Sequence, residues 1–439
     1  MNLKKLIRKV HLWLGLTSGL VVFVLGTTGC LWVFQEELWP IVHNDLLLVK
    51  EPASGNPLPI SQNLQAAQQA VGSEIPLNQV TVINQKNRSY QLSNRTHIEQ
   101  PDAIWYWEEI ERNLWVYVNP YTSEILGIQD ETLHFFEVIR FLHMSLLLRY
   151  EMGHKITGWA TLIFIIMLTT GLVLWWPRNN KAFKVRTWFR WKSDTKWKRK
   201  NYDLHNIIGF YSMFLVIFIA LTGLMWAFSW FSDGVEWIAN GGKTIKEEAI
   251  NVESTITQHN STHPLDMVHH SLKTDHSEAK VYYINLPQDS AGTIGTYVAY
   301  EDRTKNVYLQ FDRYSGALLH TGDKWEDKTN GEKVWAYNFD IHTGAIGGIV
   351  GKTIAFFLSL FSASLPVTGF IIWFGRNKKK RRLKRTGGTG GAKKVVEAKE
   401  GEKLKMNRIA GPPKPTLKPV IKKSEQGRLP VIPVQDKRG

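Results

Sequence analysis

Four histidines stand at the ends of long apolar segments, where an ionisable side chain is costly. His11 and His205 open two of these segments, and His143 and His342 precede the other two. Ionisable residues at membrane depth are functional candidates by default. Two neutral imidazoles on facing helices can ligate one haem iron from both sides, and a helix bundle can enclose the ring. The spacing therefore predicts two haem sites, suited to electron transfer: His11 with His205, and His143 with His342.

A fifth histidine competes for the second site. His143 lies 13 residues before the apolar segment that begins at Ile156. At about 1.5 Å per residue, this is about 20 Å along a straight helix. The ring reaches the bilayer only if Met144–Gly153 bends back. His154 stands at the boundary itself, so we expect His143 as the ligand and His154 as a competing outer ligand.

Glycines after the histidines would let a flat ring approach the backbone. They are Gly15, Gly209, Gly344, Gly347 and Gly348. The single cysteine, Cys30, excludes a disulfide framework, a cysteine zinc site and an iron–sulfur cluster. Metal chemistry must therefore use histidine, carboxylates or a bound cofactor. Interfacial placement, a proton relay and a zinc pair remain alternative roles for the four histidines.

Four apolar stretches are long enough to cross a bilayer, which takes about 20 residues. They are Leu12–Phe34, Ile156–Trp176, Ile207–Phe228 and Ile354–Phe374. Residues 178–200 hold ten Lys and Arg against one Asp, whereas residues 35–141 carry 6 basic and 14 acidic groups and residues 229–340 carry 10 and 17. Because basic loops stay inside, both termini are expected in the cytoplasm.

The spans repeat. His11, Thr28-Gly29 and Trp32 recur 194 residues later as His205, Thr222-Gly223 and Trp226, and Thr170-Gly171 recurs 198 residues later as Thr368-Gly369. Each outer segment ends in a strand–turn–strand pattern, over 116–126 and 307–318. Helices are expected before them, at Ile60–Val71 and Pro264–Leu272. The fold class predicted is an integral membrane protein, mainly α, with a duplicated two-helix unit and two small α+β domains outside.

The predicted organisation has eight parts. They are an N-terminal segment with the first span (1–36), an outer domain (37–141), the second span with its approach (142–177), a basic cytoplasmic loop (178–203), the third span (204–230), a second outer domain (231–340), the fourth span with its approach (341–375) and a disordered basic cytoplasmic tail (376–439).

The net charge of +15 belongs to the tail. Residues 376–439 contain 21 Lys and Arg against 5 Asp and Glu, which leaves the remainder of the chain at −1. Such a composition, rich in Gly, Pro and Lys, is typical of disorder. A basic tail beside a membrane is expected here, with no nucleic-acid partner.

At four motifs the chain resembles the PepSY-associated transmembrane-helix family. They are His11 with Gly15, Leu142-His143, Asp203-Leu204-His205-Asn206 and Ile341-His342-Thr343-Gly344. The resemblance covers about residues 5–375 and implies that the outer domains are PepSY modules. It also implies two b-type haems, the bacterial inner membrane, and reduction of ferric siderophores outside by electrons that enter at the inner haem. His154 departs from the family pattern.

The electron donor would be a separate cytoplasmic reductase or a quinol, because no Gly-rich dinucleotide fingerprint follows a strand in the tail. The leading interpretation is thus a ferric-chelate reductase in the lipid bilayer, with a ferric siderophore or other ferric chelate as substrate. One alternative is a non-enzymatic membrane scaffold that binds or inhibits an envelope protease. Another is a haem-bearing, quinol-linked redox subunit whose acceptor is a protein.

Overall fold

Four long helices form the membrane part of the chain. The computed structural model describes residues 3–50, 55–98, 102–245, 252–256 and 262–386. Four of its helices are long and apolar enough to cross a membrane. They are α1 (Leu3–Trp32), α6 (Tyr150–Trp175), α8 (Trp197–Ala227) and the segment Ala345–Lys378, most of which belongs to α12 (Gly348–Thr386). The four predicted spans are confirmed, and the chain is a multi-pass membrane protein.

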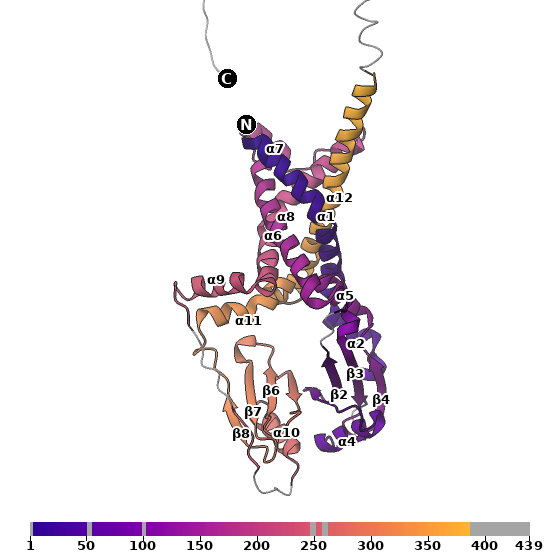
Figure 1. Cartoon of the computed structure of the whole chain (residues 1–439), viewed down its shortest axis with the longest axis vertical. Helices are drawn as coiled ribbons and strands as arrows, with labels where there is room; N and C mark the ends of the chain where they lie inside the picture. The colour runs from indigo at the N-terminus through magenta and orange to yellow at the C-terminus, as the bar shows by residue number, and fades with distance from the viewer. Residues whose placement is uncertain (1–2, 51–54, 99–101, 246–251, 257–261, 387–439) are drawn as a thin grey trace, which may run out of the picture. The chain divides into compact units, whose positions relative to one another are not determined.

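Small residues bring these helices close together (Figure 1). A Cβ atom on Gly26 of α1 would lie 2.7 Å from the backbone nitrogen of Ala363 in α12. A Cβ atom on Gly158 of α6 would lie 2.7 Å from the Cβ atom of Ala227 in α8. Glycine at these points lets two backbones approach, as is usual between membrane helices. The apolar core between the helices consists of Val22, Phe164, Leu168, Met213, Val216, Ala220 and Leu358.

Two shorter helices fold back against the bundle. The helix α5 (Phe135–Ser145) ends in Leu146 and Leu147, whose φ angles of 58° and 63° reverse the chain into α6. The returning helix passes so closely that a Cβ atom on Gly153 would lie 1.9 Å from the Ser145 carbonyl oxygen. The bend expected within 144–153 is therefore present. His143 lies against the bundle, not about 20 Å along a straight extension of it.

The second half of the chain makes the same reversal with a different residue. The helix α11 (Asn330–Thr343) ends at Gly344, which has a φ of 77°, and η3 (Ala345–Gly347) leads into α12. A Cβ atom on Gly351 would lie 2.1 Å from the Gly344 carbonyl oxygen. Both histidines that precede a span are thus brought back beside the helices.

The strands of both outer segments pair into one antiparallel sheet of eight strands, in the order β4-β3-β2-β1-β5-β6-β7-β8. The strands are β1 (Gln79–Ile83), β2 (Tyr90–His97), β3 (Ile110–Val118), β4 (Ile125–Asp130), β5 (Val281–Asn285), β6 (Ile294–Ala299), β7 (Val307–Phe311) and β8 (Leu318–Thr321). The join lies between β1 and β5, where Val80 faces Ile284 and Val82 faces Tyr282. Both predicted hairpins are present, as β3–β4 and β7–β8.

One apolar core lies between this sheet and two helices. The helices α4 (Ile60–Val71) and α10 (Pro264–Asp275) match the two predicted outer helices. Ile60, Ala67, Val268 and Leu272 of these helices are fully buried, with Val80, Leu92, Val116, Ile284 and Val298 from the strands. The two outer segments therefore share their strands and their core, whereas the sequence pattern treats them as two domains.

The remaining elements connect these parts. They are α2 (Gln35–Val42), α3 (Asn44–Leu47), η1 (Tyr106–Glu109), α7 (Asn180–Arg186), α9 (Ser229–Ala239) and η2 (Arg303–Lys305). One prediction needs correction: α12 continues to Thr386, so the segment expected as a disordered tail from residue 376 begins as helix. Its Lys and Arg residues are good helix formers and favour a helix C-terminus. Residues 387–439 of that predicted tail lie outside the described residues.

Candidate functional site

Each of the four predicted histidines contacts a Thr-Gly dipeptide on another helix. The Nδ1 atom lies 2.9 Å from a threonine Oγ1 in His11–Thr170, His143–Thr28 and His205–Thr368, and 3.0 Å in His342–Thr222. The glycine that follows each threonine leaves room for the ring. A Cβ atom there would meet the imidazole Cε1 at 3.3 Å on Gly171 and Gly369, 3.5 Å on Gly223 and 3.7 Å on Gly29.

The threonines also fix which ring nitrogen carries the proton. Each hydroxyl contacts the carbonyl four residues earlier at 2.8 to 2.9 Å, which uses its only hydrogen. Its oxygen is then left to accept the Nδ1–H of the histidine. The Nδ1 atom of His342 also lies 3.0 Å from the carbonyl oxygen of Ile219, which can only accept.

Ile219 stands three residues before Thr222, and the other three histidines interact with the carbonyl at the same position before their own threonine. These carbonyls belong to Leu25 for His143, Met167 for His11 and Leu365 for His205. All four rings therefore present Nε2 as the unprotonated nitrogen, and among the described residues Nε2 of these four has no hydrogen-bond partner. Second-shell bonds of this type orient metal-ligating histidines.

The pair nearer the sheet is His143 of α5 and His342 of α11, which we call the sheet-side pair. Their ring centroids are 6.0 Å apart and their planes are inclined at 77°. An imidazole nitrogen binds a metal ion at about 2 Å, which places the centres of two rings on one ion about 6 Å apart. The separation of the two ring centroids therefore fits two histidine ligands that would hold one iron ion.

Burial keeps both rings of the sheet-side pair neutral. Burial lowers the pKa of His143 to about 4. Burial and, to a smaller extent, the charge of His143 lower the pKa of His342 to about 3. Neutral imidazole is the form that ligates metals, so this pair is ready to do so near pH 7.

The second pair, His11 of α1 and His205 of α8, lies toward the connection between α6 and α8, and we call it the loop-side pair. The two rings lie near enough for a charge on His11 to be felt at His205. His11 is held by α6 and His205 by α12, through Thr170 and Thr368. Of the glycines expected to admit a flat ring, Gly15 faces the side chain of Met167 and Gly209 that of Leu365.

His154 lies apart from both pairs. Its Nε2 atom is 3.0 Å from the carbonyl oxygen of Trp226, and its Nδ1 atom is 3.3 Å from that of Met144. The ring also stacks on Tyr150 with centroids 4.8 Å apart. With both nitrogens next to backbone carbonyls, His154 is not presented to His342, whereas His143 is.

Two groups of residues near the histidine pairs were not assigned a role from sequence. The first is the set of four threonines, which appeared only as markers of the duplication. The second is the repeated tryptophan: Trp226 lies 5.1 Å from His342 between ring centroids, and Trp32 lies 5.9 Å from Phe339. The recurrence of Thr-Gly in all four spans was the available signal for the first group.

The donor set suits a cofactor more than a bare ion. Within the described ranges there is no group of three or more His, Cys, Asp or Glu side chains that could hold a metal ion. Each histidine pair supplies two nitrogens, and a haem macrocycle supplies the other four. The free Nε2 atoms, the separation of the sheet-side rings and the glycines at the ring edges all fit that group.

Comparison with known protein families gives one match. A family model described as the PepSY-associated TM region matches residues 8–376. This range includes α6, α8, most of α1 and α12, both histidine pairs and the eight strands. No curated protein matches the chain.

Proposed function

Because the chain belongs to the PepSY-associated TM region family, we propose that it is a membrane oxidoreductase with two b-type haems that reduces a ferric chelate on the side of the sheet. The observation that carries the proposal is the set of four His–Thr pairs, which leaves four Nε2 lone pairs free. Haem ligated by two imidazoles supplies a one-electron carrier with no open iron position for oxygen.

The chain's own residues would do three things for this chemistry. The Nε2 atoms of His11 and His205 would hold one haem, and those of His143 and His342 the other. The threonines keep the Nδ1 protons and so fix the rings in one tautomer and one orientation. The apolar core with Val22, Leu168 and Val216 fills the bundle between the two pairs.

The reaction adds one electron to a ferric ion held by a chelator, probed most simply with a ferric siderophore, and yields ferrous iron. That electron is supplied by a separate cytoplasmic reductase or by a quinol. Siderophores that prefer ferric iron hold the ferrous product weakly, so reduction releases it.

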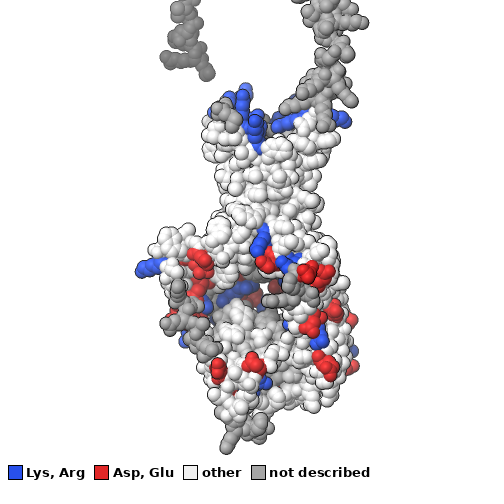
Figure 2. Space-filling view, in the orientation of Figure 1, with Lys and Arg blue, Asp and Glu red and all other residues white. Residues whose placement is uncertain are grey.

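The direction of transfer follows from charge. Lys and Arg gather at the end of the helices away from the sheet, and Asp and Glu are frequent around the sheet (Figure 2). Because basic segments remain on the cytoplasmic side, we assign the loop-side pair and both termini to the cytoplasm of a bacterial inner membrane. The sheet then faces outward, where the ferric chelate arrives.

The test is the haem content and spectrum of the purified protein. We expect two haems per chain in the wild type and one after His11→Ala or His143→Ala. His270→Ala, an exposed residue of α10, is the control and should keep two. A wild-type protein with well under one haem per chain would refute the proposal. A scaffold that regulates a protease would function equally well in all of these variants.

Membranes provide the assay for the acceptor. Membranes that contain the protein should reduce an external ferric chelate, and membranes with His143→Ala should not. A haem-bearing subunit that serves a protein acceptor would keep its spectrum but would show no difference in this assay.

A further inference from the structure

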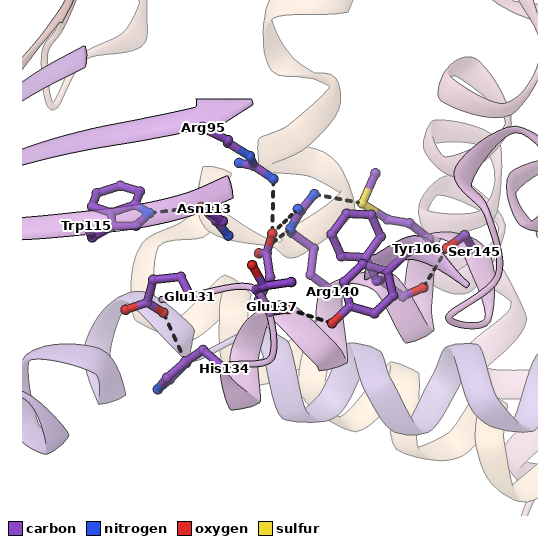
Figure 3. A network of polar contacts seen from close by, with 12 residues as sticks. Arg95, Tyr106, Asn113, Trp115, Glu131, His134, Glu137, Arg140 and Ser145 are labelled. Carbon is purple, nitrogen blue, oxygen red and sulfur yellow. Dashed lines mark hydrogen bonds and ion pairs between the residues drawn. The ribbon is translucent and has the colours of Figure 1, made fainter. Parts of the chain in front are cut away.

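A small pocket opens beside the helix that carries His143. Its volume is about 290 Å³, and its walls include Arg95 and His97 of β2, Tyr106 of η1, and Arg140, Phe141 and Met144 of α5. Figure 3 shows how Arg95 and Arg140 approach each other from the strand and the helix, with Glu137 between them. Ligand pockets span about 300 to 1,000 Å³, so this one would accept part of a small molecule, such as one arm of a chelate.

Glu137 holds the two guanidinium groups together. Its Oε1 accepts a hydrogen bond from Arg95 at 3.0 Å, and its Oε2 accepts one from Nε of Arg140 at 2.8 Å. Among the described residues the Arg95 side chain donates a hydrogen bond only to Glu137, and it is 41% exposed. A guanidinium has five N–H donors in a planar fork that matches a pair of anionic oxygens. Arg95 therefore has donors left for a ligand.

Two arginines line the pocket within an acidic segment. Arg95 and Arg140 share the pocket wall with one carboxylate, Glu109, and Glu137 lies between the two guanidinium groups. Glu109 is already engaged, because its Oε2 accepts the backbone N–H of Tyr150 at 2.9 Å. Residues 35–141 as a whole carry 14 acidic and 6 basic groups. Two arginines that share one carboxylate are thus an exception in this part of the chain.

Aromatic rings form the other wall. Phe141 stacks on Tyr106 with centroids 4.0 Å apart and planes at 14°, and the guanidinium carbon of Arg140 lies 4.4 Å from the Phe141 centroid. A flat ring or a planar carboxylate can lie along such a wall while its oxygens meet the guanidinium groups.

The pocket also lies next to the sheet-side pair. Arg140 and His143 are three residues apart on α5, and Met144 follows His143 directly. Residues three apart on a helix are neighbours on its surface. A molecule held by Arg140 is therefore within one helical turn of the residue that would ligate the outer iron.

We propose that this pocket binds an anionic arm of the incoming chelate, a carboxylate or a catecholate, and so selects anionic ferric chelates over cationic ones. The inference deepens the proposed function and rests on it. Arg95 is the selecting group, Arg140 is held in place by Glu137 and Phe141, and the aromatic wall sets the plane of the arm.

The experiment uses gallium(III) chelates, which bind as the ferric ones do but accept no electron. Equilibrium dialysis of the purified full-length protein measures the affinity for gallium citrate, for an anionic gallium tris-catecholate and for a cationic gallium trihydroxamate. We expect both anionic probes to bind at least tenfold more tightly than the cationic one. Arg95→Gln should weaken the anionic probes about tenfold and leave the cationic probe unchanged, because one charge-assisted hydrogen bond is lost.

Arg112→Gln on β3 is the matched control. Its side chain is 36% exposed and pairs with Glu111 outside the pocket, so its affinities should equal those of the wild type. Tight binding of only one anionic probe would identify which type of arm the pocket takes. Equal affinities for anionic and cationic probes, or an Arg95→Gln protein that binds like the wild type, would overturn the inference.

Haem content is measured on the same samples. If the protein holds two haems but binds anionic and cationic probes equally, the proposed role of the pocket is refuted and the proposed function is not. A protein without haem that still prefers the anionic probes refutes the proposed function and leaves the pocket standing.

Discussion

Thr28→Val tests whether the threonines hold the histidines. Valine has nearly the shape of threonine but no hydroxyl, so the change removes the acceptor 2.9 Å from Nδ1 of His143 and little else. The carbonyl of Leu25 still interacts with that ring. The buried N–H therefore loses its better partner without becoming entirely unpaired.

The expected loss is about tenfold in the affinity of the sheet-side haem. This corresponds to about 1.4 kcal/mol, which is near the top of the range for one net hydrogen bond and at the lower limit for loss of a partner to a metal-ligating histidine. The assay follows haem transfer to excess apomyoglobin, which resolves the two haems of each chain by their affinity. The loop-side haem should transfer as it does in the wild type.

Thr27→Val is the matched control. Thr27 is the preceding residue, and its hydroxyl donates to the carbonyl oxygen of Phe23 at 2.8 Å on the exposed side of α1. The same substitution there should leave both haems unchanged. If the two variants release haem equally, the threonine does not position His143, and the account of the four His–Thr pairs is wrong.

Three further predictions concern the surroundings of His143. His154→Ala should keep two haems per chain by pyridine haemochrome, because both of its ring nitrogens lie next to carbonyls, and loss of one haem would make His154 the outer ligand. Gly153→Ala should lower the melting temperature and the haem content, because the added Cβ meets the Ser145 carbonyl oxygen at 1.9 Å; Gly234→Ala in α9, with nothing within 4 Å, should change neither. Burial raises the pKa of Glu131 from 4.5 to about 7, so the folded state binds more protons than the unfolded state between these values. The Glu131 carboxyl therefore contributes stability that is lost as pH rises from about 5 to 8. In scanning fluorimetry the melting temperature of the wild type should fall relative to that of Glu131→Gln over this range, and a difference that does not change with pH would refute the assignment to Glu131.

The sequence alone predicted the parts of the fold that depend on local pattern. The four spans, the helix Ile60–Val71 and both hairpins follow from runs of apolar residues, their period and turn residues. The joining of the outer segments through β1 and β5 could not be read in this way. Alternation shows which face of a strand is buried but leaves open which edge meets another strand.

The same limit applies to the candidate site. The duplication singled out the four histidines and their pairing, because residues at equivalent places in two copies lie at equivalent depths. It could not place the threonines beside them, since a hydrogen bond between helices depends on how each helix is rotated. The assignment of His143 required a bend before α6, but no turn residue marked its position, because Leu146 and Leu147 are unusual residues for a left-handed turn. The second half of the chain uses Gly344 at this point, which is the ordinary choice.

The two copies have separate tasks at the histidine pairs. Every His–Thr contact lies within one copy: His11–Thr170 and His143–Thr28 in the first, His205–Thr368 and His342–Thr222 in the second. Every pair of rings, in contrast, takes one histidine from each copy. The contacts within a copy therefore fix how each ring is turned and which nitrogen is free.

The contacts between the copies fix how far apart the rings stand. These contacts are the approach of α1 to α12 at Gly26, that of α6 to α8 at Gly158, and the join of β1 to β5. One copy alone has two oriented histidines and no complete pair. It follows that a shift between the copies changes both ring separations together, whereas loss of one threonine disturbs one ring. Two histidine pairs are thereby held to a single spacing by one interface.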